Sequence, residues 1–289
     1  MKPIDFKRYT LFLVMTYLLL PALSCVYVPA HKPDFSSMPV TERKEAFTAM
    51  MLPLIRAANK KVMSQRQYVE KLSHQHTFSD DEITLLRRIG DQYKLPLSKT
   101  PPEKSWFEKI LTRVDILPPS MMLVQAATES AWGTSRFSVT GNNYYGMWCY
   151  SKGCGMVPKE RPAGHTYEVR RFNTTQDSVD AYLHNINTFS AYVGLRSIRA
   201  DQRSEKKPLN SMELVEGLVK YSQMGAAYVE SLRKWIRRDH LRKFDEQMVT
   251  EPEPAVKDIK NAKDVQDAKD TKDIHYYKQA SRLFENHKP

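Results

Sequence analysis

The sequence predicts a mainly helical (α+β) domain with one small β-hairpin region, followed by a charged tail. Three observations predict this. Apolar residues recur at helical spacing in most segments between residues 41 and 247. Residues 133–172 lack that spacing and hold most of the chain's glycines. Residues 251–273 repeat Lys-Asp pairs and have almost no large apolar side chain, so they cannot build a core.

The N-terminus has the pattern of an export signal. A basic start, residues 2–8, precedes an uncharged stretch over residues 9–24. Residues 22–24 fit the small-x-small rule for cleavage, and Cys25 follows where a lipoprotein would be lipidated, although Ala22 stands where Leu is usual. A cleaved signal, a lipoprotein signal and a retained membrane anchor therefore remain open for residues 1–25. All three place the rest of the chain in the cell envelope, the periplasm or outside the cell.

The next elements form a helical region, residues 41–118, after a Pro- and Ser-containing linker over residues 26–40. Helical spacing covers residues 41–73, where Pro53 is expected to kink or break the helix. Ser79 opens a capping box for a second helix. A short amphipathic helix over 103–114 completes the region.

The main domain is expected over residues 119–247. It begins with a nearly all-apolar helix, residues 121–131, which belongs inside a domain. Strands are expected around residues 145–150 and 165–172. Further helices are expected from Thr174, from Ser211 and after Gly225, and the last of them has a basic face. A disordered or loosely helical tail, residues 251–289, ends the chain.

Two cysteines remain outside the signal, Cys149 and Cys154, in the segment "CYSKGC". Beside Gly153 and Gly155 they can close a tight loop by a disulfide in an oxidising compartment. A pair of free thiols is the alternative. A zinc site is disfavoured because no second Cys pair or closely spaced His pair accompanies them.

Glu129 is the main candidate for chemistry. It lies in the last turn of the apolar helix, where partial burial and the negative end of the helix dipole should both raise the pKa of its carboxyl. A carboxyl that stays protonated near neutral pH suits a general acid for glycosidic bond cleavage. Gln125 lies one turn earlier and could orient Glu129. The alternative is that Glu129 is merely the polar tip of a core helix.

Glycines, asparagines and aromatic residues follow Glu129 closely. The aromatic rings offer flat apolar faces that suit a sugar chain, or they belong to the core. The substrate-binding candidates are Gln125, Trp132, Asn143, Tyr145, Gly146 and Trp148.

The segment "QAATESAWGTSRFSVTGNNYYGMW" resembles the core motif of the bacterial glucosaminidases, which are peptidoglycan hydrolases. Residues 41–247 are similar to the Bax-like branch. The resemblance implies a lysozyme-like, mainly helical fold with a small β-hairpin lobe over the cleft, and cleavage after N-acetylglucosamine. By the same resemblance Glu129 is the catalytic acid, Tyr192 lines the site opposite it, and Tyr145-Gly146 forms the cleft floor.

The resemblance also implies a second glutamate on the β-hairpin lobe, and Glu168 or Glu160 could supply it. Glu168 is favoured; if neither reaches the site, the acetamido group of the substrate would have to assist. The resemblance implies no metal and no organic cofactor.

The sequence therefore predicts a peptidoglycan endo-β-N-acetylglucosaminidase whose partner is the peptidoglycan glycan strand. A non-catalytic glycan-binding or assembly protein and a lytic transglycosylase remain alternatives. The formal net charge of +11 favours anionic surroundings. Nucleic acid is a poor candidate partner because no nucleic-acid motif accompanies the basic residues.

Overall fold

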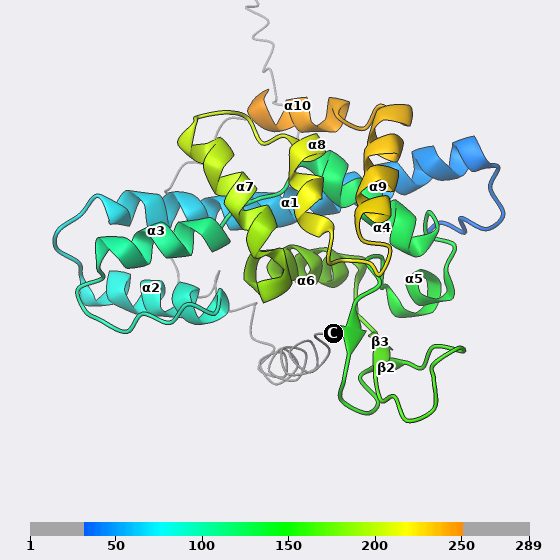
Figure 1. Ribbon diagram of the computed structural model, residues 1–289, viewed down its shortest axis with the longest axis horizontal. Coiled ribbons are helices and arrows are strands. Elements are labelled where there is room, and N and C mark those ends of the chain that lie inside the picture. Colours follow the sequence, from blue (N-terminus) through cyan, green and yellow to red (C-terminus); the bar gives the residue numbers. More distant parts are fainter. Residues whose placement is uncertain (1–31, 251–289) are drawn as a thin grey trace, which may run out of the picture.

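The computed structural model describes residues 32–250. The predicted signal with Cys25 and the predicted tail lie outside the described residues. The described part is mainly helical and carries one small antiparallel sheet (Figure 1). This confirms the predicted fold class of a mainly helical chain with a small β lobe. None of the described helices combines the length and the apolar character needed to cross a bilayer.

Helix α1, Val40–Ser73, runs along most of the described body (Figure 1). Its C-terminal half packs with α2, Asp80–Gln92, and α3, Lys104–Arg113, around a satellite core that includes Leu72, Leu86 and Ile110. The Ser79 capping box predicted for α2 is present: the Ser79 hydroxyl accepts the Glu82 N–H, and the Glu82 carboxylate accepts the Ser79 N–H.

The N-terminal half of α1 belongs to the main core, which surrounds α4, Pro119–Ser130. Ten of the twelve residues of α4 are buried, as its apolar sequence predicts. The helices around it are α6, Thr175–Thr188; α7, Val193–Ser204; α9, Ala226–Arg238; and α10, Lys243–Thr250. Short helical segments join them: α5, Arg136–Gly141; η1, Ser190–Tyr192; α8, Ser211–Leu214; and η2, Val215–Leu218.

The β lobe, residues 142–173, projects from one side of the helices (Figure 1). It contains β1, Trp148–Cys149; β2, Gly155–Met156; and β3, Glu168–Arg170, in the antiparallel order β1-β3-β2. The register pairs Cys149 with Glu168 and Met156 with Val169.

Three details differ from the local predictions. Pro53 does not break α1, because the apolar residues on either side of it are buried in the main core, and the alternative of a kink at Pro53 stays a prediction. Phe35, inside the predicted linker, is buried and lies against Gly133, where a built Cβ would approach the Phe35 ring to 2.4 Å. Asn210, rather than Ser211, caps α8.

Candidate active site

Glu129 is the next-to-last residue of α4 and is partly exposed, whereas most of the helix before it is buried. The chain then turns sharply, because Ala131, Trp132 and Gly133 all have positive φ angles. Two of these are not glycine, and such a backbone costs of order 1–2 kcal/mol per residue. Strain of this kind is often concentrated at functional sites, where the surrounding structure maintains it.

A chain of hydrogen bonds holds the Glu129 carboxyl. The Tyr228 hydroxyl of α9 donates to Glu129 Oε1 at 2.7 Å. Gln125 Nε2 donates to the Tyr228 hydroxyl at 3.2 Å, and the Tyr182 hydroxyl of α6 donates to Gln125 Oε1. Because Gln125 donates to Tyr228, the Tyr228 proton is directed at Glu129. The predicted neighbour Gln125 therefore orients Glu129 through Tyr228.

Burial raises the pKa of the Glu129 carboxyl, and the hydrogen bond from Tyr228 opposes this by favouring the charged form. The direction agrees with the prediction, and burial is the main cause. Neither Glu160 nor Glu168 is among the described groups that influence the pKa of Glu129. Burial also raises the pKa of Tyr228, with the negative charge of Glu129 as the next cause, so Tyr228 stays a neutral donor.

Gly146 lies against the other carboxyl oxygen of Glu129. Its φ angle is +64°, and a Cβ built on it would lie 3.1 Å from Glu129 Oε2. The Tyr221 hydroxyl donates to the Tyr145 carbonyl oxygen at 2.6 Å, which fixes the peptide that leads into Gly146. The Tyr145 ring is fully buried and stacks on Tyr182 at 4.0 Å between centroids. Gly146 thus lies beside the acid, and the cleft floor that the resemblance implies for Tyr145 and Gly146 stays a prediction.

Tyr192 lies beside rings that neighbour the acid, and its predicted role opposite Glu129 stays a prediction. Its centroid is 6.0 Å from that of Tyr221, and Tyr221 stacks on Tyr228 at 5.8 Å. The sequence reasoning missed Tyr228, Tyr221 and Tyr182 as neighbours of Glu129. These tyrosines occupy apolar positions in helical segments, which predicts that they belong to the core. No local sequence pattern predicts what their hydroxyl groups contact.

Trp132 and Asn143 have structural partners. The Trp132 ring packs between Phe47 and Trp235, at centroid distances of 5.5 and 6.0 Å. Buried Asn143 braces the β lobe: its Nδ2 donates to the Met147 and Arg170 carbonyl oxygens, and its Oδ1 accepts the Met147 N–H. Sugar contacts for these two residues stay predictions.

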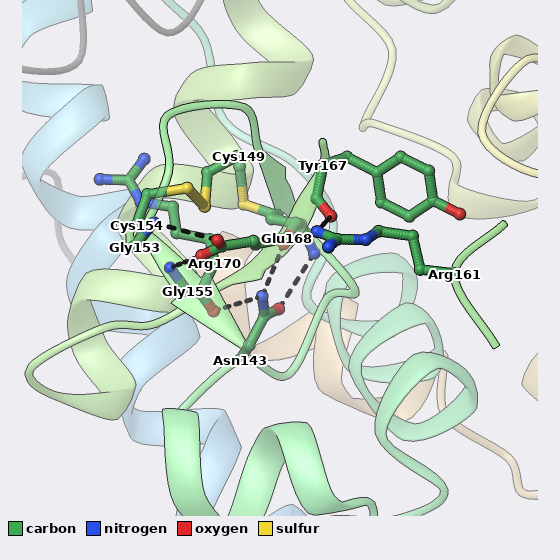
Figure 2. The surroundings of a disulfide bond; sticks show 10 residues. Asn143, Cys149, Gly153, Cys154, Gly155, Arg161, Tyr167, Glu168 and Arg170 are labelled. Carbon is green, nitrogen blue, oxygen red and sulfur yellow. Dashed lines mark hydrogen bonds between the residues drawn. A yellow bond between two sulfur atoms is a disulfide. The ribbon is translucent and has the colours of Figure 1, made fainter. Parts of the chain in front are cut away.

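Glu168 is buried in the β lobe and lies beside the disulfide (Figure 2). The structure joins Cys149 to Cys154. The two oxygens of the Glu168 carboxylate accept the Gly153 N–H at 3.0 Å and the Gly155 N–H at 2.8 Å. The buried carboxylate therefore closes the loop that the disulfide also closes. This arrangement is structural, and the catalytic role of Glu168 stays a prediction.

Glu160 and Trp148 differ from Glu168 in their exposure. Glu160 is exposed in the segment between β2 and β3. Trp148 is 43% exposed and stacks on Tyr167, with ring centroids 4.4 Å apart and planes 7° from parallel. These two residues are the predicted site residues on the outer surface of the β lobe.

A cavity of about 230 Å³ lies between α3 and α7, away from Glu129. Buried Asp115 lines it and forms ion pairs with Arg66 at 3.1 Å and Arg203 at 2.8 Å. Arg199 Nη1 also donates to the Asp115 carbonyl oxygen. The pairs join α1 and α7 to the segment that follows α3, so this cluster has a structural explanation.

Comparisons with known proteins identify the family. The glucosaminidase family, described as mannosyl-glycoprotein endo-beta-N-acetylglucosaminidase, matches residues 104–288. "Protein bax" of Escherichia coli (strain K12) is 32% identical over 197 residues, which are 68% of this chain and 70% of that protein. No solved structure matches significantly. The chain belongs to the glucosaminidase family and is a Bax-like member of it.

Proposed function

We propose that this protein is a peptidoglycan endo-β-N-acetylglucosaminidase of the cell envelope, with Glu129 as its general acid. The observation that carries the proposal is the half-buried Glu129 carboxyl, which is held by Tyr228 and has a raised pKa. Family membership supports a glycosidase. The export signal predicted over residues 1–25 supports the location.

The hydrogen bonds also suggest which oxygen carries the catalytic proton. Glu129 Oε1 accepts from Tyr228, so the proton of the neutral acid belongs on Oε2. Oε2 faces Gly146, the one residue type that adds no side chain to the space beside it. In this mechanism Oε2 protonates the leaving glycosidic oxygen, and Tyr228 then stabilises the new carboxylate.

The second step requires a group that activates water or stabilises the oxocarbenium-like charge. Glu160 has the more accessible carboxylate of the two predicted residues, because it is exposed, whereas Glu168 is buried and bonded to two backbone N–H groups. If Glu160 acts, Glu160→Gln lowers the turnover number strongly at unchanged thermal stability. If the acetamido group of the substrate acts instead, Glu160→Gln leaves the turnover number near that of the wild type.

The activity is tested by incubating the purified full-length protein with peptidoglycan and measuring product masses. New reducing ends on N-acetylglucosamine support the proposal. A lytic transglycosylase is the second candidate, because it also needs only one acid, and it would leave anhydromuramic ends that are lighter by one water. Binding without new ends would contradict both enzymatic functions and favour a glycan-binding protein.

A further inference from the structure

The outer face of the β lobe carries an aromatic pair that the core does not need. Trp148 lies in β1, and Tyr167 directly precedes β3. The register pairs Cys149 with Glu168, so Trp148 and Tyr167 occupy diagonal positions on the opposite face of the strands. Their rings are nearly parallel, and Trp148 remains 43% exposed. The two rings are therefore stacked, so Tyr167 covers one face of Trp148 and supports the part of Trp148 that stays exposed. We call this stacked pair the platform.

The inner face of the same strands is braced. Cys149 is bonded to Cys154, and Glu168 accepts the N–H groups on both sides of Cys154 (Figure 2). These contacts fix the strands from which the platform projects. A rigid aromatic plane loses little conformational entropy when a ligand stacks on it.

The platform is close to the candidate acid along the chain. Gly146 lies against Glu129, and Trp148 follows two residues later. Two residues span at most about 7 Å, so Trp148 Cα is no farther than that from Gly146 Cα. A glycan that reaches Glu129 can therefore place a neighbouring sugar on the platform.

A guanidinium group lies at the edge of the platform. Arg161 Nη1 donates to the Tyr167 carbonyl oxygen at 3.1 Å, which holds the head group beside the stacked rings (Figure 2). A guanidinium has five N–H donors and suits a carboxylate better than a neutral hydroxyl. Residues 150–171 carry five Lys/Arg and two Asp/Glu, so 5 − 2 = +3, and Glu168 is turned inward.

We propose that the Trp148–Tyr167 platform and Arg161 bind a sugar that carries a carboxylate substituent, and that this subsite selects an acidic glycan over a neutral one. The inference rests on the proposed function, because the sugar belongs to the same glycan strand that Glu129 cleaves. The apolar ring face stacks on Trp148, and the carboxylate of an ether-linked or peptidyl substituent meets Arg161.

The test compares two oligosaccharides of equal length in the full-length Glu129→Gln protein, which binds without cleavage. One is a neutral N-acetylglucosamine oligomer, and the other is a peptide-free peptidoglycan fragment with lactyl carboxylates on alternate sugars. Calorimetry measures both dissociation constants at low and high salt. We expect tighter binding of the acidic fragment, with a preference that weakens as salt screens the charge.

Substitutions in the Glu129→Gln protein separate the contribution of ring stacking from that of the guanidinium group. Trp148→Ala should weaken binding of both ligands about tenfold, and Trp148→Phe should restore part of it. Arg161→Gln should weaken binding of the acidic fragment about threefold and leave the neutral oligomer unchanged. Arg136→Gln is the matched control, since Arg136 also donates to a backbone carbonyl oxygen, that of Val157, and should change neither constant.

Equal affinity for the two ligands would overturn the inference, as would an Arg161→Gln variant that loses both ligands alike. If the Glu129→Gln protein binds neither ligand while the wild type releases reducing ends from peptidoglycan, the subsite is wrong and the proposed function stands. If the wild type also releases none, the proposed function fails separately.

Discussion

Glu129 and Glu168 are two carboxyl groups with opposite surroundings. Glu129 is held by one tyrosine hydroxyl at the end of a buried helix, and burial raises its pKa. Glu168 is more deeply buried and satisfied by two backbone N–H groups in a disulfide-closed loop. The comparison teaches that burial alone does not mark an acid catalyst. The number and kind of hydrogen-bond donors decide whether a carboxyl can give up a proton or serves to hold the chain.

The largest expected effect is a difference in cleavage activity between variants of Glu129 and Glu168. Glu129→Gln should lower the rate of reducing-end release by about 10²–10⁴-fold, because a general acid contributes that much. The folded structure should persist, since Gln can still accept the bond from Tyr228. The measurement is the rate of reducing-end release by Glu129→Gln and by Glu168→Gln on the same peptidoglycan. A Glu168→Gln variant that loses as much activity as Glu129→Gln, at equal stability, would break the comparison.

A second substitution fills the space beside the Glu129 oxygen that is expected to carry the proton. Gly146→Ala places a Cβ about where the leaving oxygen must approach, 3.1 Å from Oε2 before any relaxation. It also adds of order 1–2 kcal/mol of backbone strain at a φ angle of +64°. We expect a clear loss of turnover. The matched control is Gly153→Ala, which has a similar positive φ angle but nothing within 4 Å of its built Cβ. Equal losses in both variants would contradict a specific role for Gly146.

Thermal unfolding tests the structural role of Glu168, the other member of the comparison. In Glu168→Gln one oxygen becomes an NH₂ group, so one of the two backbone N–H groups loses its acceptor. An unsatisfied buried donor costs about 1–3 kcal/mol, and Glu168→Gln should lower the melting temperature accordingly. The measurement is the melting temperature by calorimetry of Glu168→Gln, Glu160→Gln and the wild type, all with the disulfide formed. Because Glu160 is exposed, its variant should melt with the wild type.

The smallest expected effect is a shift in pH dependence. Tyr228→Phe removes the hydrogen bond that lowers the pKa of Glu129, so that pKa should rise further. A general acid works in its protonated form, and activity is lost as pH rises through its pKa. The alkaline limb of the rate profile should therefore move to higher pH. Tyr221→Phe is the control, since its hydroxyl donates to a backbone carbonyl oxygen, and its limb should stay in place. A shift to lower pH in Tyr228→Phe would contradict the assignment.

Much of the fold follows from local sequence. Apolar spacing and the capping residues Ser79 and Thr174 predict the helices they begin, because caps satisfy the first free N–H groups within a few residues. The five-residue separation of Cys149 and Cys154 makes their disulfide foreseeable in the same way. The break that Pro53 could have caused is absent, because burial of the apolar stripe on α1 outweighs one missing backbone bond.

The sequence by itself determined a helical chain, an acid at the end of an apolar helix and a cysteine pair able to close a short loop, since each depends on residues that are close along the chain. Only the tertiary structure decided what surrounds each carboxyl. Tyr228 reaches Glu129 across 99 residues, and Trp132 is covered by Phe47 and Trp235. The physical reason is that burial and hydrogen-bond donors come from segments brought together by packing, and no local pattern records which segments meet.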